Sequence, residues 1–357
     1  MEPVQSFVYE ANAARVVFGA GALRQVAAEA ERLGLRRALV LSTPNQRSEA
    51  QRVADLLGSR CAGIHAGAVM HVPEESAQEA VARASALDAD GAVAIGGGST
   101  TGLAKAIALE TGLPYIAIPT SYAGSEMTPI YGLTAGGQKK TGRNPRVLPR
   151  VTLYDPELTV GLPAQLTVTS GLNAIAHAAE GLYARDTNPV MALMAEEGIR
   201  ALAAGIPAVV TTPDNLEGRA QCLYGAWLCG TVLGSVGMAL HHKLCHTLGG
   251  SFNLPHAETH TIVLPHALAY NAAAAPEAMF RIQRAVGNHQ TSAAAALYDL
   301  AGQHGAPLAL RDIGMRAQDI DVAVEQALAN PYWNPRPIER EPIRALLQAA
   351  YDGSRPA

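Results

Sequence analysis

The histidines are the residues of this chain whose types and spacing point most directly to chemistry. Six of the 11 histidines fall within one short stretch, at His241, His242, His246, His256, His260 and His266. His242 and His246 are four residues apart, as are Asn173 and His177, so each pair shares one face of a helix. Imidazole moves protons near neutral pH and is the commonest metal ligand. The two helix faces therefore predict a proton-transfer site or a metal site.

A glycine-rich turn is the second feature with chemical meaning. Gly96, Gly97, Gly98 and Ser99 follow the apolar run AVAI directly and precede a helical pattern. Glycines let a backbone approach a phosphate closely, and the N–H groups of a helix N-terminus then point at the anion. The turn matches neither the P-loop nor the GxGxxG fingerprint. We expect Gly97, Gly98 and Ser99 to bind the phosphates of a cofactor; the alternative is a tight turn without a ligand.

A loop rich in small polar residues follows the next apolar run along the chain. Residues 119–127 read PTSYAGSEM. The carboxyl ends of parallel strands form the binding edge of such a sheet. Side chains at these positions can contact phosphate, ribose or a nicotinamide amide, so we expect Thr120, Ser121, Ser125 and Met127 to bind the cofactor.

A local excess of positive charge follows this loop. Lys140, Arg143 and Arg146 lie in a stretch that has no acid between Glu126 and Asp155. Guanidinium and ammonium groups bind small anions. We expect the three side chains to contact an anionic substrate and Lys140 also to contact the cofactor; the alternative is a solvated positive face.

Two kinds of hydrophobic pattern divide the chain. Apolar runs fall at residues 37–42, 91–99, 114–120 and 150–156 and alternate with helical patterns, which predicts a parallel sheet covered on both faces. After about residue 160 only the helical period remains. We therefore expect an α/β dinucleotide-binding domain over residues 1–160 and an all-helical catalytic domain over residues 161–357, with a ligand between them.

Composition excludes several classes of protein. Hydrophobic residues make up 48% of the 357 residues, charged residues 16%, and the formal net charge is −4, which argues against disorder and against nucleic-acid binding. Residues 222–240 carry no charge, but their glycines and the lack of a basic-flank asymmetry or of a second span favour one buried helix over a membrane span. The four cysteines form no CxxC pair, which fits free thiols in the cytoplasm, and residues 1–10 lack the apolar core of a signal peptide.

Four motifs together resemble a known family. GGGSTTGLAK, IPTSYAGSEMTP, SGLNAIAHAAEG and HHKLCHTLGGSFNLPHAETHTIVLPH are similar to the iron-containing alcohol dehydrogenase superfamily, and most of all to its maleylacetate reductase branch. The resemblance implies a dehydroquinate synthase-like fold, with an α/β NAD(P)-binding domain followed by an all-α domain. It also implies NADH or NADPH as cofactor and a homodimer.

The resemblance also shows one departure at the metal site. Metal-dependent relatives bind Fe²⁺ or Zn²⁺ through an Asp, a His four residues later, and two His fourteen residues apart. The matching positions here are Asn173, His177, His242 and His256. A neutral amide is a poorer partner for a divalent cation than a carboxylate. We therefore expect that no metal is required.

The activity that the resemblance implies is reduction of maleylacetate to 3-oxoadipate in the degradation of aromatic compounds. Charge would develop on an enolate oxygen, which needs a stabilising group and a proton donor. We assign both tasks to His242, His246 and His256, with His246 as the acid because the resemblance places it nearest the nicotinamide. Asn173 and His177 would orient a carboxylate or carbonyl of the dianionic substrate.

Cofactor preference follows from the loop after the first apolar run. Many NAD-specific relatives place an acid there to bind the ribose 2′-hydroxyl, whereas this chain has Thr43, with Asn45 two residues later and Arg47 close by. We expect Thr43 and Asn45 to contact the cofactor and NADPH to be accepted beside NADH.

Three other functions are compatible with these patterns. A metal-dependent (Fe or Zn) alcohol or lactaldehyde dehydrogenase would lose activity with a chelator. A dehydroquinate-synthase-like lyase would show no net NADH consumption. A non-catalytic nucleotide-binding protein would have no use for the histidine cluster.

Overall fold

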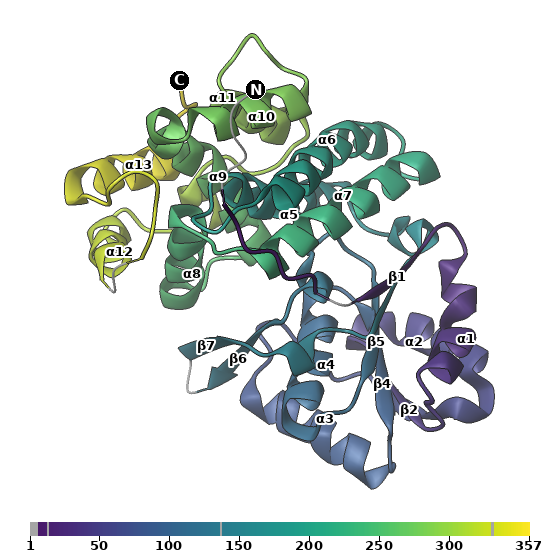
Figure 1. Cartoon of the computed structure of the whole chain (residues 1–357). Coiled ribbons are helices and arrows are strands. Elements are labelled where there is room, and N and C mark those ends of the chain that lie inside the picture. The colour runs from purple at the N-terminus through teal and green to yellow at the C-terminus, as the bar shows by residue number, and fades with distance from the viewer. Residues whose placement is uncertain (1–5, 13, 136–137, 330–331) are drawn as a thin grey trace. The chain divides into compact units, whose positions relative to one another are not determined.

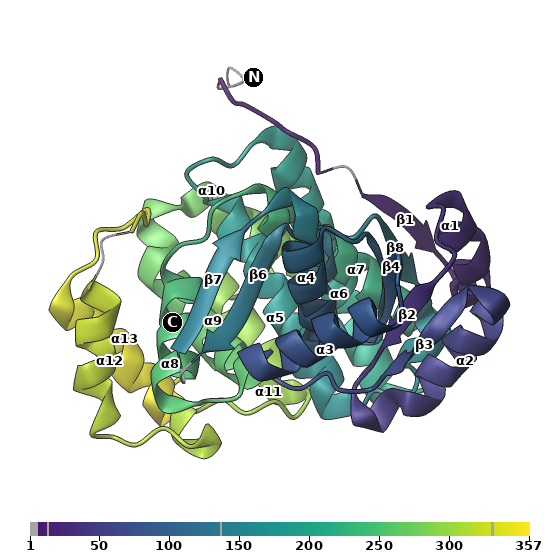
Figure 2. The ribbon, with the colours of Figure 1, turned by 90° about the horizontal axis from the view of Figure 1, so that it is seen from below.

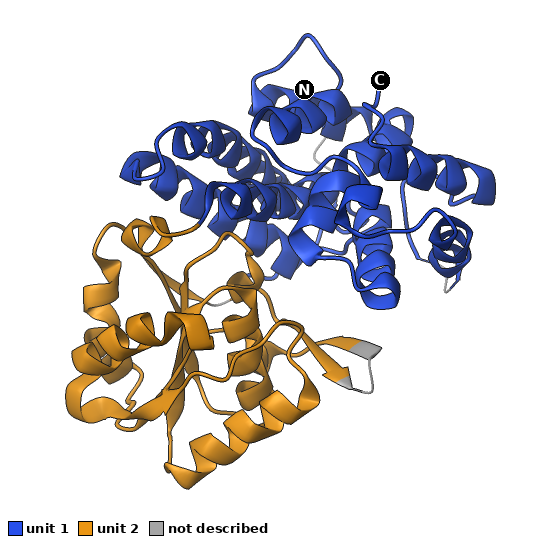
Figure 3. Cartoon of the chain, turned by 180° about the vertical axis from the view of Figure 1, so that it is seen from behind, with its two compact units in different colours: residues 1–11, 163–357 blue, residues 12–162 orange. Residues whose placement is uncertain are grey.

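The computed structural model describes residues 6–12, 14–135, 138–329 and 332–357. It divides into two compact units (Figure 3): an α/β unit over residues 12–162 and a helical unit over residues 163–357, joined by residues 6–11. The sequence prediction placed residues 6–11 in the α/β domain. They form no helix or strand, and their contacts assign them to the helical unit instead.

A six-stranded parallel sheet forms the centre of the α/β unit (Figure 1). In spatial order its strands are β1 (Arg15–Phe18), β8 (Val151–Tyr154), β5 (Tyr115–Pro119), β4 (Gly91–Gly96), β2 (Ala38–Leu41) and β3 (Cys61–His65). The four apolar runs predicted as strands are confirmed as β2, β4, β5 and β8. The sequence analysis missed β1 and β3, which lie at the two edges of the sheet.

Helices cover both faces of this sheet, as the uninterrupted apolar runs predicted. The covering helices are α1 (Val26–Arg32) and α2 (Arg47–Leu57) on one face and α3 (Glu74–Ala86) and α4 (Gly98–Thr111) on the other. Alternate residues of one strand enter different cores: Val93 and Ile95 pack with α1 and α2, while Ala92 and Ala94 pack with α3 and α4. A strand buried on both faces has no polar side to reveal its period.

An antiparallel hairpin branches from the α/β unit. It consists of β6 (Ile130–Ala135) and β7 (Gln138–Arg143), and β6 contacts α3 and α4 (Figure 2). The sequence analysis identified this segment only by its positive charge.

The second unit contains no strand within its described residues, which confirms the prediction of an all-helical domain. Its helices are α5 (Ala164–Leu182), α6 (Pro189–Thr211), α7 (Leu216–Ser235), α8 (Leu240–Phe252), α9 (His256–Asn271), α10 (Pro276–Val286), α11 (Ala293–Gln303), α12 (Asp319–Leu328) and α13 (Arg340–Asp352). Helices α5, α6 and α7 pack against one another, and α9 packs on α5 and α8. Gly225 permits the close approach of α6 and α7, because a Cβ there would lie 2.8 Å from the carbonyl oxygen of Gly198.

The uncharged stretch 222–240 is not the single helix that its composition predicted. Helix α7 ends at Ser235 and α8 begins at Leu240. Within the described residues no single helix has the length and hydropathy to cross a membrane; α7 and α8 meet that test only as a pair, which is bent by 95°. The prediction failed because an apolar run gives no sign of where its backbone turns.

Candidate functional site

Three helices of the helical unit bring the predicted histidines together. His177 lies on α5, His242 on α8, and His256 and His260 on α9. Nδ1 of His177 lies 2.8 Å from Nε2 of His242. The ring of His260 lies 5.1 Å from that of His242 and 4.3 Å from that of His256, between centroids. The predicted meeting of the two helix faces is present within this unit.

A buried carboxylate that the sequence analysis missed organises the cluster. Glu180 is fully buried, and its two oxygens accept the backbone N–H groups of Ala239, His241 and His242 at 2.9, 2.7 and 3.3 Å. Residue 239 offers no side-chain cap to α8. Glu180 on α5 therefore supplies from a distance the negative charge and the acceptors that the first turn of α8 lacks.

Glu180 also fixes the protonation of His242. Its Oε2 lies 2.7 Å from Nδ1 of His242. A carboxylate only accepts hydrogen bonds, so Nδ1 of His242 carries a hydrogen and its Nε2 faces His177. The three side chains form a chain of hydrogen bonds, Glu180–His242–His177, in which the carboxylate orients the imidazole.

A second histidine pair lies deeper in the same cluster. His241 and His260 are both fully buried, and Nε2 of His241 lies 2.9 Å from Nδ1 of His260. Burial holds the pKa of both imidazoles well below the ordinary value, and the neighbouring histidines lower them further. Both rings are therefore neutral near pH 7.

The buried neutral histidines make stability depend on pH. Burial also lowers the pKa of His266, to about 4. In the unfolded chain each of these three histidines takes up a proton as the pH falls through about 6.5, whereas the folded protein keeps them neutral. The free energy of unfolding should therefore fall below about pH 6.5, by about 1.4 kcal/mol per pH unit for each histidine.

Thermal melting of the protein and of a His266→Asn variant tests this expectation. The loss of Tm between about pH 7.5 and about pH 5.5 should be smaller in the variant, because one of the three groups has been removed. An equal loss of Tm in both proteins would contradict the assignment of His266 as a neutral buried group.

The remaining predicted residues of the helical unit lie at the margins of the hydrogen-bonded chain. Asn173 is buried on α5, and its Oδ1 has no hydrogen-bond partner within the described residues. His256 is half-buried at the first turn of α9. His246 is exposed on α8, with its ring centroid 6.1 Å from that of His242. An exposed imidazole one turn from the buried chain can exchange protons with solvent.

The carboxyl edge of the sheet gathers the predicted cofactor residues of the α/β unit. Gly96 ends β4 with φ +152°, and a Cβ there would lie 2.4 Å from Oγ1 of Thr100, so glycine is required. Gly98 is exposed at the start of α4. Nε2 of Gln46 donates to Oγ1 of Thr120 at 2.8 Å and thereby links the ends of β2 and β5.

The strand order places these residues at a switch point. The chain runs outward from β2 to β3, then returns to the other side of β2 to form β4 and continues to β5. Connections from β2 and β4 thus leave in opposite directions and open a crevice at their carboxyl ends, where open α/β sheets bind nucleotides. Thr43 and Asn45 follow β2, and Gly97, Gly98 and Ser99 follow β4.

A buried lysine supports the neighbouring loop. Nζ of Lys105 on α4 donates to the carbonyl oxygens of Ser125, Thr128 and Ile130 and to Oγ1 of Thr128, at 2.6–3.0 Å. Burial lowers the pKa of Lys105 to about 7, opposed by the charge of Glu126. The side chain holds the segment that carries Ser125 and Met127, two of the predicted cofactor contacts.

Lys105→Met removes the ammonium group that donates to the oxygens of Ser125, Thr128 and Ile130. We expect the KM for NADH to rise about tenfold and the protein to lose about 2–4 kcal/mol of stability, since buried acceptors lose a charged partner. Steady-state kinetics and thermal melting measure the two effects. An unchanged KM in a folded variant would contradict the supporting role.

The three basic residues do not form one cluster on the hairpin. Lys140, Arg143 and Arg146 are all exposed. Lys140 pairs with Leu133 and Arg143 with Ile130 in the β6–β7 ladder, and residues three apart on a strand point to opposite faces. Arg146 lies beyond β7 in a short 3-10 turn. The expectation that all three side chains act on one anion is therefore weakened.

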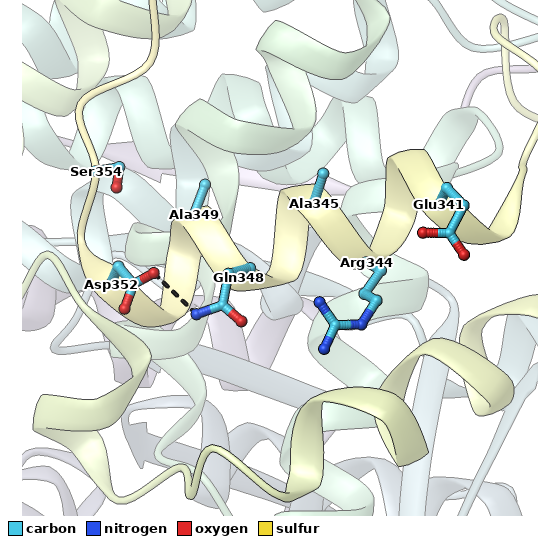
Figure 4. A pocket seen from close by; sticks show the side chains of 7 residues that line it. All are labelled: Glu341, Arg344, Ala345, Gln348, Ala349, Asp352 and Ser354. Carbon is cyan, nitrogen blue, oxygen red and sulfur yellow. Dashed lines mark hydrogen bonds between the residues drawn. The ribbon is translucent and has the colours of Figure 1, made fainter.

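A shallow surface pocket of the helical unit lies along α13 (Figure 4). Its lining includes Arg344, Gln348 and Asp352, of which the last two are hydrogen bonded at 2.8 Å. The opposite side of α13 packs in the core through Ile343 and Leu347. None of the predicted site residues lines this pocket.

Comparison with known proteins decides the family. The model described as iron-containing alcohol dehydrogenase matches residues 13–156, and that of the C-terminal region of the Fe-containing alcohol dehydrogenase family matches residues 167–351. The chain belongs to the iron-containing alcohol dehydrogenase family. This confirms the resemblance that the four motifs indicated.

Several members of the iron-containing alcohol dehydrogenase family are similar to the chain over its whole length. The maleylacetate reductase of Burkholderia cepacia is 61% identical, covering 99% of this chain and 100% of the relative. The crystal structure of maleylacetate reductase from Agrobacterium tumefaciens is 55% identical, with TM-score 0.95 and coverage of 99% and 100%. A Ralstonia eutropha JMP134 protein assigned to the alcohol dehydrogenases is 76% identical, with TM-score 0.98 and the same coverage.

The family name implies iron, but the side chains at the expected positions do not fit a divalent cation in this arrangement. The neutral amide of Asn173 is a poorer partner for a divalent cation than the expected carboxylate, and the facing nitrogens of His177 and His242 share a hydrogen bond. Asn173 contributes no charge, and Glu180 is engaged by backbone N–H groups.

A second group of potential metal ligands also has two nitrogens that are already hydrogen bonded to each other. Within the described residues, His241, Cys245 and His260 bring their nitrogen and sulfur atoms within 4.8 Å of one another. The facing nitrogens of the two histidines are again joined by a hydrogen bond, and burial raises the pKa of the thiol well above its ordinary value. We therefore do not interpret these three side chains as a metal site.

Proposed function

We propose that this chain reduces the carbon–carbon double bond of maleylacetate to give 3-oxoadipate, with NADH or NADPH as the reductant. The observation that carries the proposal is a histidine cluster linked to a buried carboxylate, with an amide at the expected acid ligand, in a chain 61% identical to a maleylacetate reductase. Such a cluster can stabilise an oxyanion and supply a proton.

The cofactor is proposed to bind at the carboxyl edge of the sheet. The open first turn of α4 at Gly98 and the required glycine at position 96 leave room for phosphates against backbone N–H groups. Thr43, Asn45, Thr120 and Ser121 would contact the sugars and the second phosphate. Thr43 stands where many NAD-specific relatives have an acid, and no acid occurs between β2 and Glu49. A 2′-phosphate therefore meets no carboxylate at that position, and we propose that NADPH is accepted beside NADH.

A bound nicotinamide would supply a hydride to the alkene carbon β to the ketone. The chain's own residues must then stabilise the enolate oxygen and protonate the neighbouring carbon. We propose that His242, whose proton is held by Glu180, and His256 stabilise the oxygen, and that His246 delivers the proton. Asn173 and His177 would orient the ketone or a carboxylate.

We propose that this chemistry requires no metal ion. The support is the hydrogen-bonded contact between His177 and His242 together with the neutral amide of Asn173. A protonated imidazole stabilises a developing oxyanion by charge and hydrogen bonding.

The second candidate is a metal-dependent alcohol or lactaldehyde dehydrogenase, favoured by the family name and by the assignment of the 76% identical structure. The test is oxidation of NADH with maleylacetate, compared with simple aldehydes, and reduction of NAD⁺ with simple alcohols. Our proposal predicts rapid turnover of maleylacetate and slow turnover of the others. Faster turnover of alcohols or aldehydes would overturn it.

We also propose a cytoplasmic homodimer acting on a dianionic substrate. The cytoplasm supplies NADH and keeps thiols reduced, which fits four free cysteines. The dimer rests on the family resemblance, and size-exclusion chromatography with light scattering tests it.

A further inference from the structure

His260 occupies the middle of the histidine cluster. Its ring centroid lies 4.3 Å from that of His256, 4.8 Å from His241, 5.1 Å from His242 and 6.1 Å from His177. The side chain is fully buried. His260 therefore lies among the side chains to which we assign oxyanion stabilisation and substrate binding, and it has no role in the proposed reaction so far.

The two ring nitrogens of His260 differ in their surroundings. Nδ1 is hydrogen bonded to Nε2 of His241. Nε2 is buried and has no hydrogen-bond partner within the described residues. Proteins leave few buried polar atoms unpaired, because such an atom has lost its water without a replacement. The unpaired Nε2 of His260 lies beside His256 and His242. An atom of a bound ligand can form the hydrogen bond that this nitrogen lacks.

We infer that His260 is a substrate-binding residue whose Nε2–H donates a hydrogen bond to a carboxylate or ketone oxygen of the substrate. The inference rests on the proposed function, because it takes the identity of the substrate from it. Maleylacetate as a dianion carries two carboxylates and a ketone and has no N–H or O–H group. Any hydrogen bond that the protein makes to it must come from a protein donor.

The contact with His241 can supply this donor. A neutral imidazole carries one hydrogen, on one nitrogen only. When Nε2–H of His241 donates to Nδ1 of His260, the hydrogen of His260 must reside on its Nε2. His241 is then a positioning residue that fixes the tautomer of His260.

A pair of substitutions separates the two nitrogens. The amide of His260→Asn reaches about the place of Nδ1 and leaves the place of Nε2 empty, whereas that of His260→Gln reaches about the place of Nε2. We expect His260→Asn to lower kcat/KM for maleylacetate about 10–100-fold, the effect of one hydrogen bond to a charged group. His260→Gln should recover activity to within about threefold of the unsubstituted protein, and both variants should bind NADH as it does.

His266→Asn is the matched control, because His266 is another buried histidine of α9 whose Nε2 has no partner within the described residues. It should leave kcat/KM unchanged. Equal losses in His260→Asn and His260→Gln, or in His266→Asn, would overturn the inference in favour of a packing role. A normal kcat/KM in His260→Asn would overturn it as well.

A measurement on the unsubstituted protein covers the case in which His260→Asn does not fold. In ¹⁵N-histidine NMR, adding 3-oxoadipate should shift one buried Nε2 resonance, which is absent from His260→Gln. No shift at saturating product would overturn the inference. A protein that does not reduce maleylacetate at all would instead overturn the proposed function, so the two failures are distinguishable.

Discussion

Replacing His246 with alanine is expected to lower kcat/KM for maleylacetate by about 10²–10⁴-fold, the usual effect of removing a proton donor. His246 is exposed on α8, one turn beyond His242, so it can take a proton from solvent between turnovers. NADH binding should be unchanged, because the loss concerns the chemical step. Stopped-flow measurement of NADH oxidation in a single turnover would report that step directly.

The pH profile separates this role from a loss of packing. In the unsubstituted protein kcat/KM should fall as rising pH removes the proton from the acid, and His246→Ala should lack that limb of the profile. His289→Ala is the control, because His289 is an exposed histidine outside the cluster. A His246→Ala variant with near-normal kcat/KM would show that another group delivers the proton.

Glu180→Gln is expected to lower kcat/KM on the order of 10²-fold while the protein still folds. The amide keeps the shape of the side chain, and its oxygen in the place of Oε1 can still accept from the backbone N–H of His241. It removes the negative charge beside His242, and when its N–H groups take the place of Oε2 they face the N–H at Nδ1 of that imidazole. The imidazole must change tautomer or lose this contact.

Stability and activity should respond differently in a matched variant. Glu29 is also buried and is bonded to Arg15 and Arg32. Glu180→Gln should lower the free energy of unfolding by about 1–2 kcal/mol, because it weakens the start of α8. Glu29→Gln should lower it by a similar amount, and both changes should appear as a lower Tm. Only Glu180→Gln should lower kcat/KM. If the two variants had equal activities, Glu180 would be only a helix cap.

The sequence predicted the elements that have a strong local signal. The strands β2, β4, β5 and β8 are buried on both faces, so each reads as an apolar run with no polar interruption. Strand β1 has only four residues and a partly exposed pattern, and β3 contains Gly63 in its middle. Both depend on their neighbours in the sheet, which a local pattern does not reveal.

The histidine cluster was predictable from spacing, but its carboxylate was missed. Glu180 lies three residues after His177 and seven after Asn173, and residues at these spacings share a helix face. That signal was present in the motif SGLNAIAHAAEG. Asn173 stands where an acid is expected four residues before His177, and this replacement predicted a cluster without a carboxylate. The structure corrects this: a carboxylate contacts His242 from the other side of the imidazole.

The sequence does not reveal which partner each buried histidine bonds to. His241 and His242 are adjacent, yet one bonds to α9 through His260 and the other to α5 through His177. Their backbone N–H groups converge on Glu180 because α8 begins there. Only the break between α7 and α8, which composition concealed, creates this arrangement.

We propose that hydrogen-bonded imidazoles replace a metal ion in this member of an iron-containing family. The most direct test is NADH oxidation with maleylacetate after exhaustive treatment with a chelator, with metal content measured on the same sample. We predict unchanged kcat/KM in protein that retains far less than one equivalent of iron or zinc per chain. Loss of activity on chelation, restored by adding Fe²⁺ or Zn²⁺, would contradict the account.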